Sequence, residues 1–68
     1  MRTYWADVNQ VGRFWRTSDA GIEYRDTATP WFQEWELAEL LTVSTLHAGE
    51  GCTIRRCTAA DAGDNPTM

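Results

Sequence analysis

Aromatic and β-branched residues recur at strand-like spacing through the first part of the chain. Residues 3–8 form one such run, and residues 13–17 and 22–26 form two more. The last two runs are separated by the segment 18–21, whose serine and aspartate favour a type I turn. Gly21 can adopt the left-handed conformation that closes a bulged hairpin. The pattern therefore predicts three strands, of which the second and third form a hairpin.

The register of this hairpin decides which side chains share a face. If the segment 18–22 contains the turn and its two flanking residues, Trp15 lies opposite Arg25 on one face. Arg16 then lies opposite Tyr24 on the other face. Each face would carry an aromatic ring beside a guanidinium group, which is typical of cation–π packing within a small sheet and, less often, of a binding surface.

A helical period replaces this alternation further along the chain. Thr29 can accept a hydrogen bond as the N-cap, and Pro30 suits the first helical position because its missing N–H needs no partner there. Trp31, Trp35 and Ala38 then recur at positions i, i+4 and i+7, which predicts one apolar face. Other apolar residues fall outside this face, so apolar surface is left over for a second layer or a partner.

The end of this helix has two interpretations. The sequence Thr-Val-Ser-Thr is a poor helix-forming segment, so the helix could end near Leu41 and residues 42–47 could form a strand. We favour the alternative, in which the helix continues to about Leu46 and Gly49 caps it. Residues 52–57 are a final strand under both interpretations.

These elements predict an α+β fold in the order βββαβ. One helix packs on one face of a small antiparallel sheet of three to four strands, or of five if residues 42–47 are also a strand. Residues 1–58 form the single domain. Residues 59–68 have no large apolar side chain except the terminal methionine, so we expect them to be a disordered C-terminal tail.

The acidic charge of the chain is concentrated in one segment. The formal net charge is −4, with ten acidic residues against six arginines and no lysine. The excess lies in residues 29–50, which carry four glutamates and no arginine. An acidic segment favours a basic protein surface over bare nucleic acid, because phosphate binding needs a cationic footprint.

Length and composition narrow the class of protein. A chain of 68 residues leaves little interior for an enclosed active site, and its four Trp, two Tyr and two Phe should first of all form the core. We expect no membrane partner and a cytoplasmic location, because the sequence has neither an apolar run of about 18 residues nor a secretory signal. Six arginines without lysine are typical of a GC-rich coding genome, such as that of a bacterium or a phage.

The candidates for metal binding and nucleophilic chemistry are His47, Cys52 and Cys57. Their spacing lacks the tight cysteine knuckle of structural zinc sites, and a fourth ligand would have to come from elsewhere. In a hairpin, Cys52 and His47 could be cross-strand neighbours, but a pocket and an oxyanion stabiliser would still be needed. We therefore expect no metal, no cofactor and no catalytic residue.

Arginines and aromatic residues of the predicted sheet suggest one possible function. Small sheets can bind single-stranded nucleic acid with rings under the bases and arginines on the phosphates. The residues that would do so here are Arg13, Arg16, Arg25, Arg55, Arg56, Trp5, Phe14, Trp15 and Tyr24. The net negative charge disfavours this single-stranded nucleic-acid-binding module, and we keep it as the alternative.

The leading hypothesis is a small non-enzymatic regulator or inhibitor that occludes a surface of a larger protein, such as a host nuclease or another enzyme. Protein interfaces draw their binding energy from Trp, Tyr and Arg, with which this chain is well supplied. The expected partner-binding residues are Trp31, Phe32, Trp35, Glu36, Glu39, Trp15 and Arg16. A homodimer that buries Phe32, Leu40 and Val43 across a two-fold axis is a third hypothesis.

Overall fold

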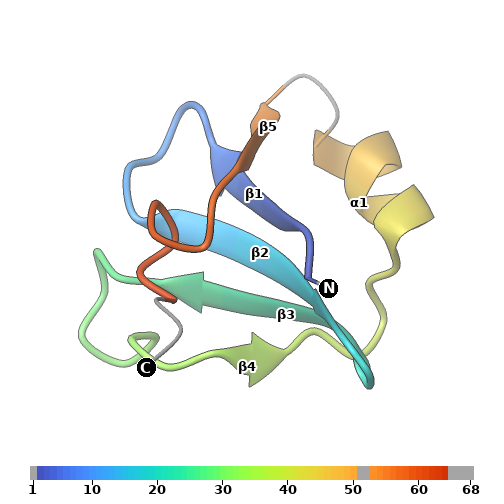
Figure 1. Cartoon of the computed structure of the whole chain (residues 1–68), viewed down its shortest axis with the longest axis horizontal. Helices are drawn as coiled ribbons and strands as arrows, with labels where there is room; N and C mark the ends of the chain where they lie inside the picture. The colour runs from blue at the N-terminus through green and yellow to red at the C-terminus, as the bar shows by residue number, and fades with distance from the viewer. Residues whose placement is uncertain (1, 51–52, 65–68) are drawn as a thin grey trace.

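The computed structural model describes residues 2–50 and 53–64, the side chain of Glu50 excepted. It is an α+β fold, as predicted (Figure 1). In chain order the elements are β1 (Tyr4–Asp7), β2 (Arg13–Ser18), β3 (Gly21–Asp26), β4 (Glu36–Leu37), α1 (Val43–Glu50) and β5 (Ile54–Cys57). No helix among the described residues is long and apolar enough to cross a membrane.

The strands form one antiparallel sheet in the order β4-β3-β2-β1-β5. The last strand therefore returns to pair with the first, at the edge opposite β4 (Figure 1). Four strands precede the helix, where the sequence predicted three. The additional strand, β4, lies within the segment that was expected to be helical.

The predicted hairpin is confirmed, but its register is shifted by one residue. Ser18 pairs with Gly21, so Trp15 lies opposite Tyr24 and Arg16 lies opposite Glu23. The hydroxyl of Ser18 accepts a hydrogen bond from the backbone N–H two residues later, which closes the turn earlier than expected. Gly21 has a φ of +133°, a conformation that side chains with a Cβ rarely adopt. In this register an aromatic ring faces an aromatic ring and an arginine faces a glutamate, whereas the sequence predicted an aromatic ring opposite each arginine.

The helix predicted to begin at Thr29 and Pro30 is wrong, because this segment extends the sheet instead. Thr29 donates its hydroxyl hydrogen to the carbonyl of Asp26. The carbonyl of Phe32 accepts from the N–H of Asp26, and the N–H of Ala38 donates to the carbonyl of Ile22. The edge of β3 would otherwise leave these backbone groups unpaired. The hydrogen bonds that this segment makes with the edge of β3 therefore outweigh the helix-start signal of Thr29 and Pro30.

The helix that does form begins further along the chain, at its own capping sequence. Thr42 accepts a hydrogen bond at its hydroxyl from the N–H of Thr45, and the hydroxyl of Thr45 accepts from the N–H of Thr42. This reciprocal pair is a capping box in which threonine takes both positions. Gly49 lies inside α1, where we expected it to cap the helix. Residues 42–47, which the sequence left between helix and strand, are the cap and the first turns of this helix.

One face of the sheet, here called the core face, carries the hydrophobic core. Residues directly opposite one another in an antiparallel sheet share a face, so Trp5, Trp15 and Tyr24 stand in one row. Leu46 of α1 and Ile22 of β3 are completely buried against these rings. Each such side chain contributes roughly 1.5–3 kcal/mol on burial. The helix therefore contacts the core through the buried Leu46, and His47 of the same helix packs on Trp5.

The opposite face, here called the guanidinium face, is covered by residues 58–64, the C-terminal turn. Figure 1 shows this orange and red segment lying across β2 and β3. Ala62 of this turn is completely buried. This differs from the expectation of a disordered tail from Ala59, although the last four residues lie outside the described residues. A small side chain and a carboxylate, rather than large apolar groups, hold the turn in place.

Candidate functional site

The seven residues expected to bind a partner do not form one surface. Trp15 is only 5% exposed and belongs to the core. Trp31 is 74% exposed, and Phe32, the next residue, packs its ring on Tyr24 at 5.9 Å between centroids. The remaining four divide between two places: Trp35 and Arg16 on the guanidinium face, and Glu36 and Glu39 on the exposed sheet edge.

The first candidate surface follows the outer edge of β3, along the segment 31–43. Several of its large apolar side chains are exposed, and Leu40 is 96% exposed. Three exposed glutamates alternate with them. The exposed side chains of this segment that we group as the edge surface are Trp31, Leu37, Leu40, Val43, Glu34, Glu36 and Glu39. They share the edge of the sheet rather than one of its faces, because Glu36 lies opposite Tyr24 and Leu37 lies opposite Glu23.

The glutamates of the edge surface carry uncompensated charge. Within the described residues, every ion pair involves Arg2, Arg13 or Arg16, and none involves these glutamates. The sequence has no lysine or arginine between Arg25 and Arg55 that could compensate them locally. The edge surface therefore combines exposed apolar groups with a net negative potential.

The second candidate surface is the guanidinium face, where several donors converge on one carboxylate. The hydroxyl of Tyr4 donates to Oδ2 of Asp64 at 2.5 Å, and Nη1 of Arg16 donates to the same oxygen at 2.6 Å. Arg2 lies 3.5 Å from it. Nε of Arg16 donates to Glu23 at 2.5 Å, so this guanidinium group bridges two carboxylates.

Trp35 completes this face from above the sheet. The guanidinium carbon of Arg16 lies 4.3 Å from the centre of its ring, and that of Arg25 lies 5.4 Å away. The ring of Tyr4 meets it edge to face at 6.3 Å. Two guanidinium groups on one indole are a cation–π arrangement worth roughly 0.5–2 kcal/mol for each contact. Trp35 thus fixes the positions of both arginines.

The ionisation of Asp64 and Tyr4 is set by this network. Burial by itself would raise the pKa of Asp64, but the hydrogen bonds from Tyr4 and Arg16 outweigh it and lower that pKa. The pKa of Tyr4 is raised, first by burial and then by its hydrogen bond to Asp64. At neutral pH the face therefore holds an ionised carboxylate against a neutral phenol.

Sequence reasoning did not assign Tyr4 or Asp64 to any site. It named Arg25 as a neighbour of Trp15 in the hairpin and for the nucleic-acid alternative, and it placed Asp64 in a disordered tail. The contact between Arg16 and Asp64 spans 48 residues, so no local spacing indicates it. The available signal was a weak one: an Asp-Ala-Gly-Asp sequence whose acidic residues could meet the arginines of the sheet.

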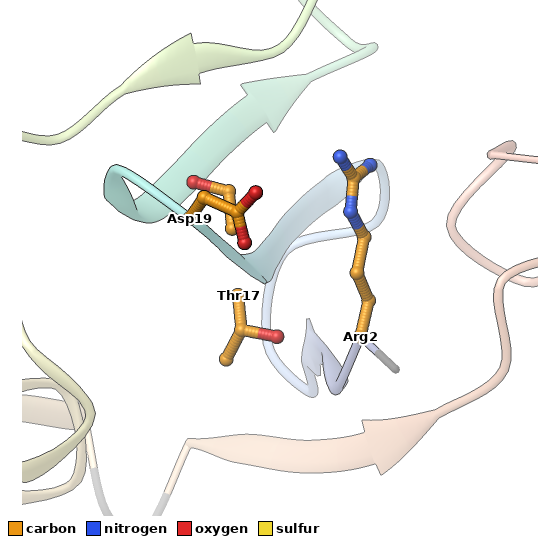
Figure 2. A pocket seen from close by; sticks show the side chains of 4 residues that line it. Arg2, Thr17 and Asp19 are labelled. Atoms are coloured by element: carbon orange, nitrogen blue, oxygen red, sulfur yellow. The ribbon is translucent and has the colours of Figure 1, made fainter.

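Among the described residues, two of the surface depressions are open and wide enough to be considered as binding sites. Arg2, Thr17, Ser18 and Asp19 line one of about 370 Å³ beside the hairpin turn. Figure 2 shows Arg2 on one side of it and Asp19 on the other. The hydroxyl of Thr17 accepts from the backbone of Thr3, and that of Ser18 is engaged in the turn. These hydroxyl groups therefore serve the hairpin.

The second depression, of about 250 Å³, lies between β1 and the loop that follows it. Val11, which is 94% exposed, and Phe14 contribute its apolar lining. Asp7 and Arg13, which also line it, form an ion pair at 3.6 Å. Figure 1 shows the loop after β1 on the side of the molecule away from α1.

Two of the three residues considered for metal binding or nucleophilic chemistry, His47 and Cys57, lie within the described residues. His47 packs edge to face on Trp5 at 5.8 Å, and Cys52 lies outside the described residues. Cys57 is a free, partly buried thiol whose pKa is raised by burial and by the nearby Asp61. No group of three or more His, Cys, Asp or Glu within the described part of the chain is placed to hold a metal ion.

No family model, no curated protein and no solved structure matches this chain. The two candidate surfaces therefore carry the functional argument by themselves.

Proposed function

We propose that this protein is a small non-enzymatic cytoplasmic module that regulates or inhibits a larger protein by binding and occluding its surface. The observation that carries the proposal is the edge surface, where apolar side chains, including Trp31 and Leu40, are exposed beside three unpaired glutamates. A largely exposed tryptophan on so small a domain is typical of a protein interface.

The partner surface is expected to be an apolar depression bordered by basic residues. Trp31 precedes β4 and Leu40 follows it, so each would anchor one end of the contact, and the glutamates between them would meet lysine or arginine of the partner. Rim charges mainly raise the association rate, whereas buried anchors slow dissociation. The same charges disfavour self-association through this surface, because a two-fold axis would bring Glu36 and Glu39 towards their own copies.

The geometry weighs against the nucleic-acid alternative. Arg13 pairs with Asp7 and Asp26, and Arg16 pairs with Glu23 and Asp64. The rings expected to stack on bases are largely committed too, because Trp5 and Trp15 are buried in the core. A phosphate backbone would have to displace these carboxylates, which a net negative chain does not favour.

The test compares three baits in an affinity capture from host extract. These are the unmodified chain, a Trp31→Ala/Leu40→Ala variant, and a Val11→Ala control that removes an equally exposed apolar group elsewhere. We expect the first and third baits to retain the same protein and the double variant to lose it. Equal capture by all three baits would overturn the proposal.

A purified partner sharpens this test. Glu36→Gln/Glu39→Gln should slow association at low salt and leave dissociation nearly unchanged. Sedimentation of the chain alone at micromolar concentration addresses the homodimer that would bury Phe32, Leu40 and Val43. We expect a monomer there. A dimer dispersed by Leu40→Ala would instead assign the edge surface to self-association.

A further inference from the structure

The C-terminal turn sits on the guanidinium face much as a bound peptide would. Its Asp64 carboxylate accepts from Tyr4 and Arg16. Nη1 of Arg25 lies 3.2 Å from the carbonyl oxygen of Ala62 and 3.3 Å from that of Gly63, so one donor is shared between two backbone acceptors. The face therefore contacts the methyl group of Ala62, the carbonyls of Ala62 and Gly63, and the carboxylate of Asp64. Another peptide can supply the same groups.

The turn is a self-contained unit. Thr58 and Asp61 cap each other through side-chain to backbone hydrogen bonds. The backbone N–H groups of Ala62, Gly63 and Asp64 all donate to carbonyls of residues 58–60. Within the described residues, no backbone–backbone hydrogen bond joins residues 59–64 to the sheet. The turn could therefore leave the face without breaking a strand pair.

The face has more hydrogen-bonding capacity than the turn uses. Nε of Arg25 and Nε1 of Trp35 are buried and have no hydrogen-bond partner. A buried unsatisfied donor costs roughly 1–3 kcal/mol, so a ligand that reached these two groups would bind with an advantage over the turn. An acidic peptide that also accepts hydrogen bonds from these two donors would therefore satisfy more of the face than the C-terminal turn does.

Charge points to the same class of ligand. With Asp64 in place, the face holds the guanidinium groups of Arg2, Arg16 and Arg25 against the carboxylates of Asp64 and Glu23. Without Asp64, three guanidinium groups face one carboxylate. The uncovered face is therefore cationic within a chain whose net charge is −4.

We propose that the guanidinium face is a binding site for an acidic peptide segment of a partner protein, and that residues 58–64 occupy it as an intramolecular competitor. The ligand would present a small residue followed by an acidic one, as Ala62, Gly63 and Asp64 do. The turn lowers the apparent affinity for such a ligand because only the open fraction of molecules can bind it. This proposal does not depend on the edge surface, which shares none of its residues.

The test uses full-length variants and a synthetic peptide, Thr-Ala-Ala-Asp-Ala-Gly-Asp, which copies residues 58–64. Asp64→Asn removes the charged anchor of the turn. Asp61→Asn is the matched control, because it removes an equal charge but keeps a capping side chain and touches no arginine. Calorimetry measures affinity, and the indole N–H signal of Trp35 in a nuclear magnetic resonance spectrum reports binding at the face.

We expect Asp64→Asn to bind the peptide at least about tenfold more tightly than the unmodified chain and Asp61→Asn to leave affinity unchanged. A peptide ending in Asn should not bind. Arg25→Gln in the Asp64→Asn background should abolish binding. Equal affinity of Asp64→Asn and the unmodified chain, or binding without movement of the Trp35 signal, would overturn the proposal.

A second variant opens the face without altering its charges. Gly63 has a φ of +73°, and a Cβ there would lie 3.2 Å from Nη1 of Arg25, so Gly63→Val should displace the turn while Asp64 is retained. It should raise peptide affinity in the same direction as Asp64→Asn. Loss of the folded state in both variants would show that the turn is an integral part of the fold, and so would overturn the proposal. Binding of a short oligothymidylate in place of the peptide would do the same.

Discussion

The two faces of the sheet are stabilised by different physical chemistry. The core face buries Trp5, Trp15, Ile22 and Leu46 without directed bonds, and its stability comes from area removed from water. The guanidinium face depends on distances and charges: two hydrogen-bond donors lie within 2.6 Å of the Asp64 carboxylate, and two guanidinium groups contact the ring of Trp35. The core face therefore fixes the fold, whereas the guanidinium face can respond to pH and to competing ligands.

The largest effect should follow from a cavity in the core face. Trp15→Ala removes a ring that is 5% exposed and should destabilise the domain by roughly 3–5 kcal/mol, close to the whole stability of a chain this small. Trp31→Ala is the matched control, because it removes the same side chain where it is 74% exposed. Urea denaturation followed by circular dichroism compares them. Similar midpoints for the two variants would contradict our assignment of the core.

A smaller loss is expected from the centre of the guanidinium face. Arg16→Gln would leave Glu23 and Asp64 without their shared partner and should cost roughly 2–3 kcal/mol. Arg55→Gln, on an exposed position of β5, should stay within about 0.5 kcal/mol of the unmodified chain. Equal melting temperatures for the two variants would show that the network contributes nothing to stability.

The pH dependence separates the two faces further. The pKa of Asp64 is lower in the folded chain than its usual value of 3.8, so its stabilisation is present above that value and is lost as the pH falls through the folded pKa. Asp64→Asn should cost roughly 1–2 kcal/mol at pH 7 and almost nothing at low pH. Thermal melts of both chains between pH 7 and about pH 2 measure this convergence. A constant difference across that range would exclude Asp64 as the titrating group.

The smallest effect on stability should come from Tyr4, whose contribution depends on pH in the alkaline range. The pKa of Tyr4 is raised above its usual value of 10.0, so its stabilisation is complete below that value and is lost as the pH rises through the folded pKa. Tyr4→Phe should cost about 1 kcal/mol at pH 7 and should abolish this alkaline loss. Melts in alkaline buffer test it, and an unchanged alkaline decline in Tyr4→Phe would assign the decline to another group.

Local sequence was sufficient for the elements whose partners are near in the chain. The hairpin of β2 and β3 follows from alternation and from a turn closed by Gly21, and the final strand was predicted to within two residues of its start. The predicted class of fold, a small antiparallel sheet with one helix, is confirmed. The candidate site was predicted less well, since six of the seven expected residues divide among the core and two separate surfaces and Phe32 packs on Tyr24.

The sequence determined which segments prefer a strand or a turn, and it placed the excess acid in the segment that now lines one edge of the sheet. Only the tertiary structure decided that residues 32–38 extend the sheet and that Asp64 meets Arg16 across 48 residues. The reason is that Thr29 and Pro30 signal a helix through bonds within their own segment, whereas the edge of β3 requires hydrogen bonds that only another segment can supply. A pattern along the chain records the first kind of bond and not the second.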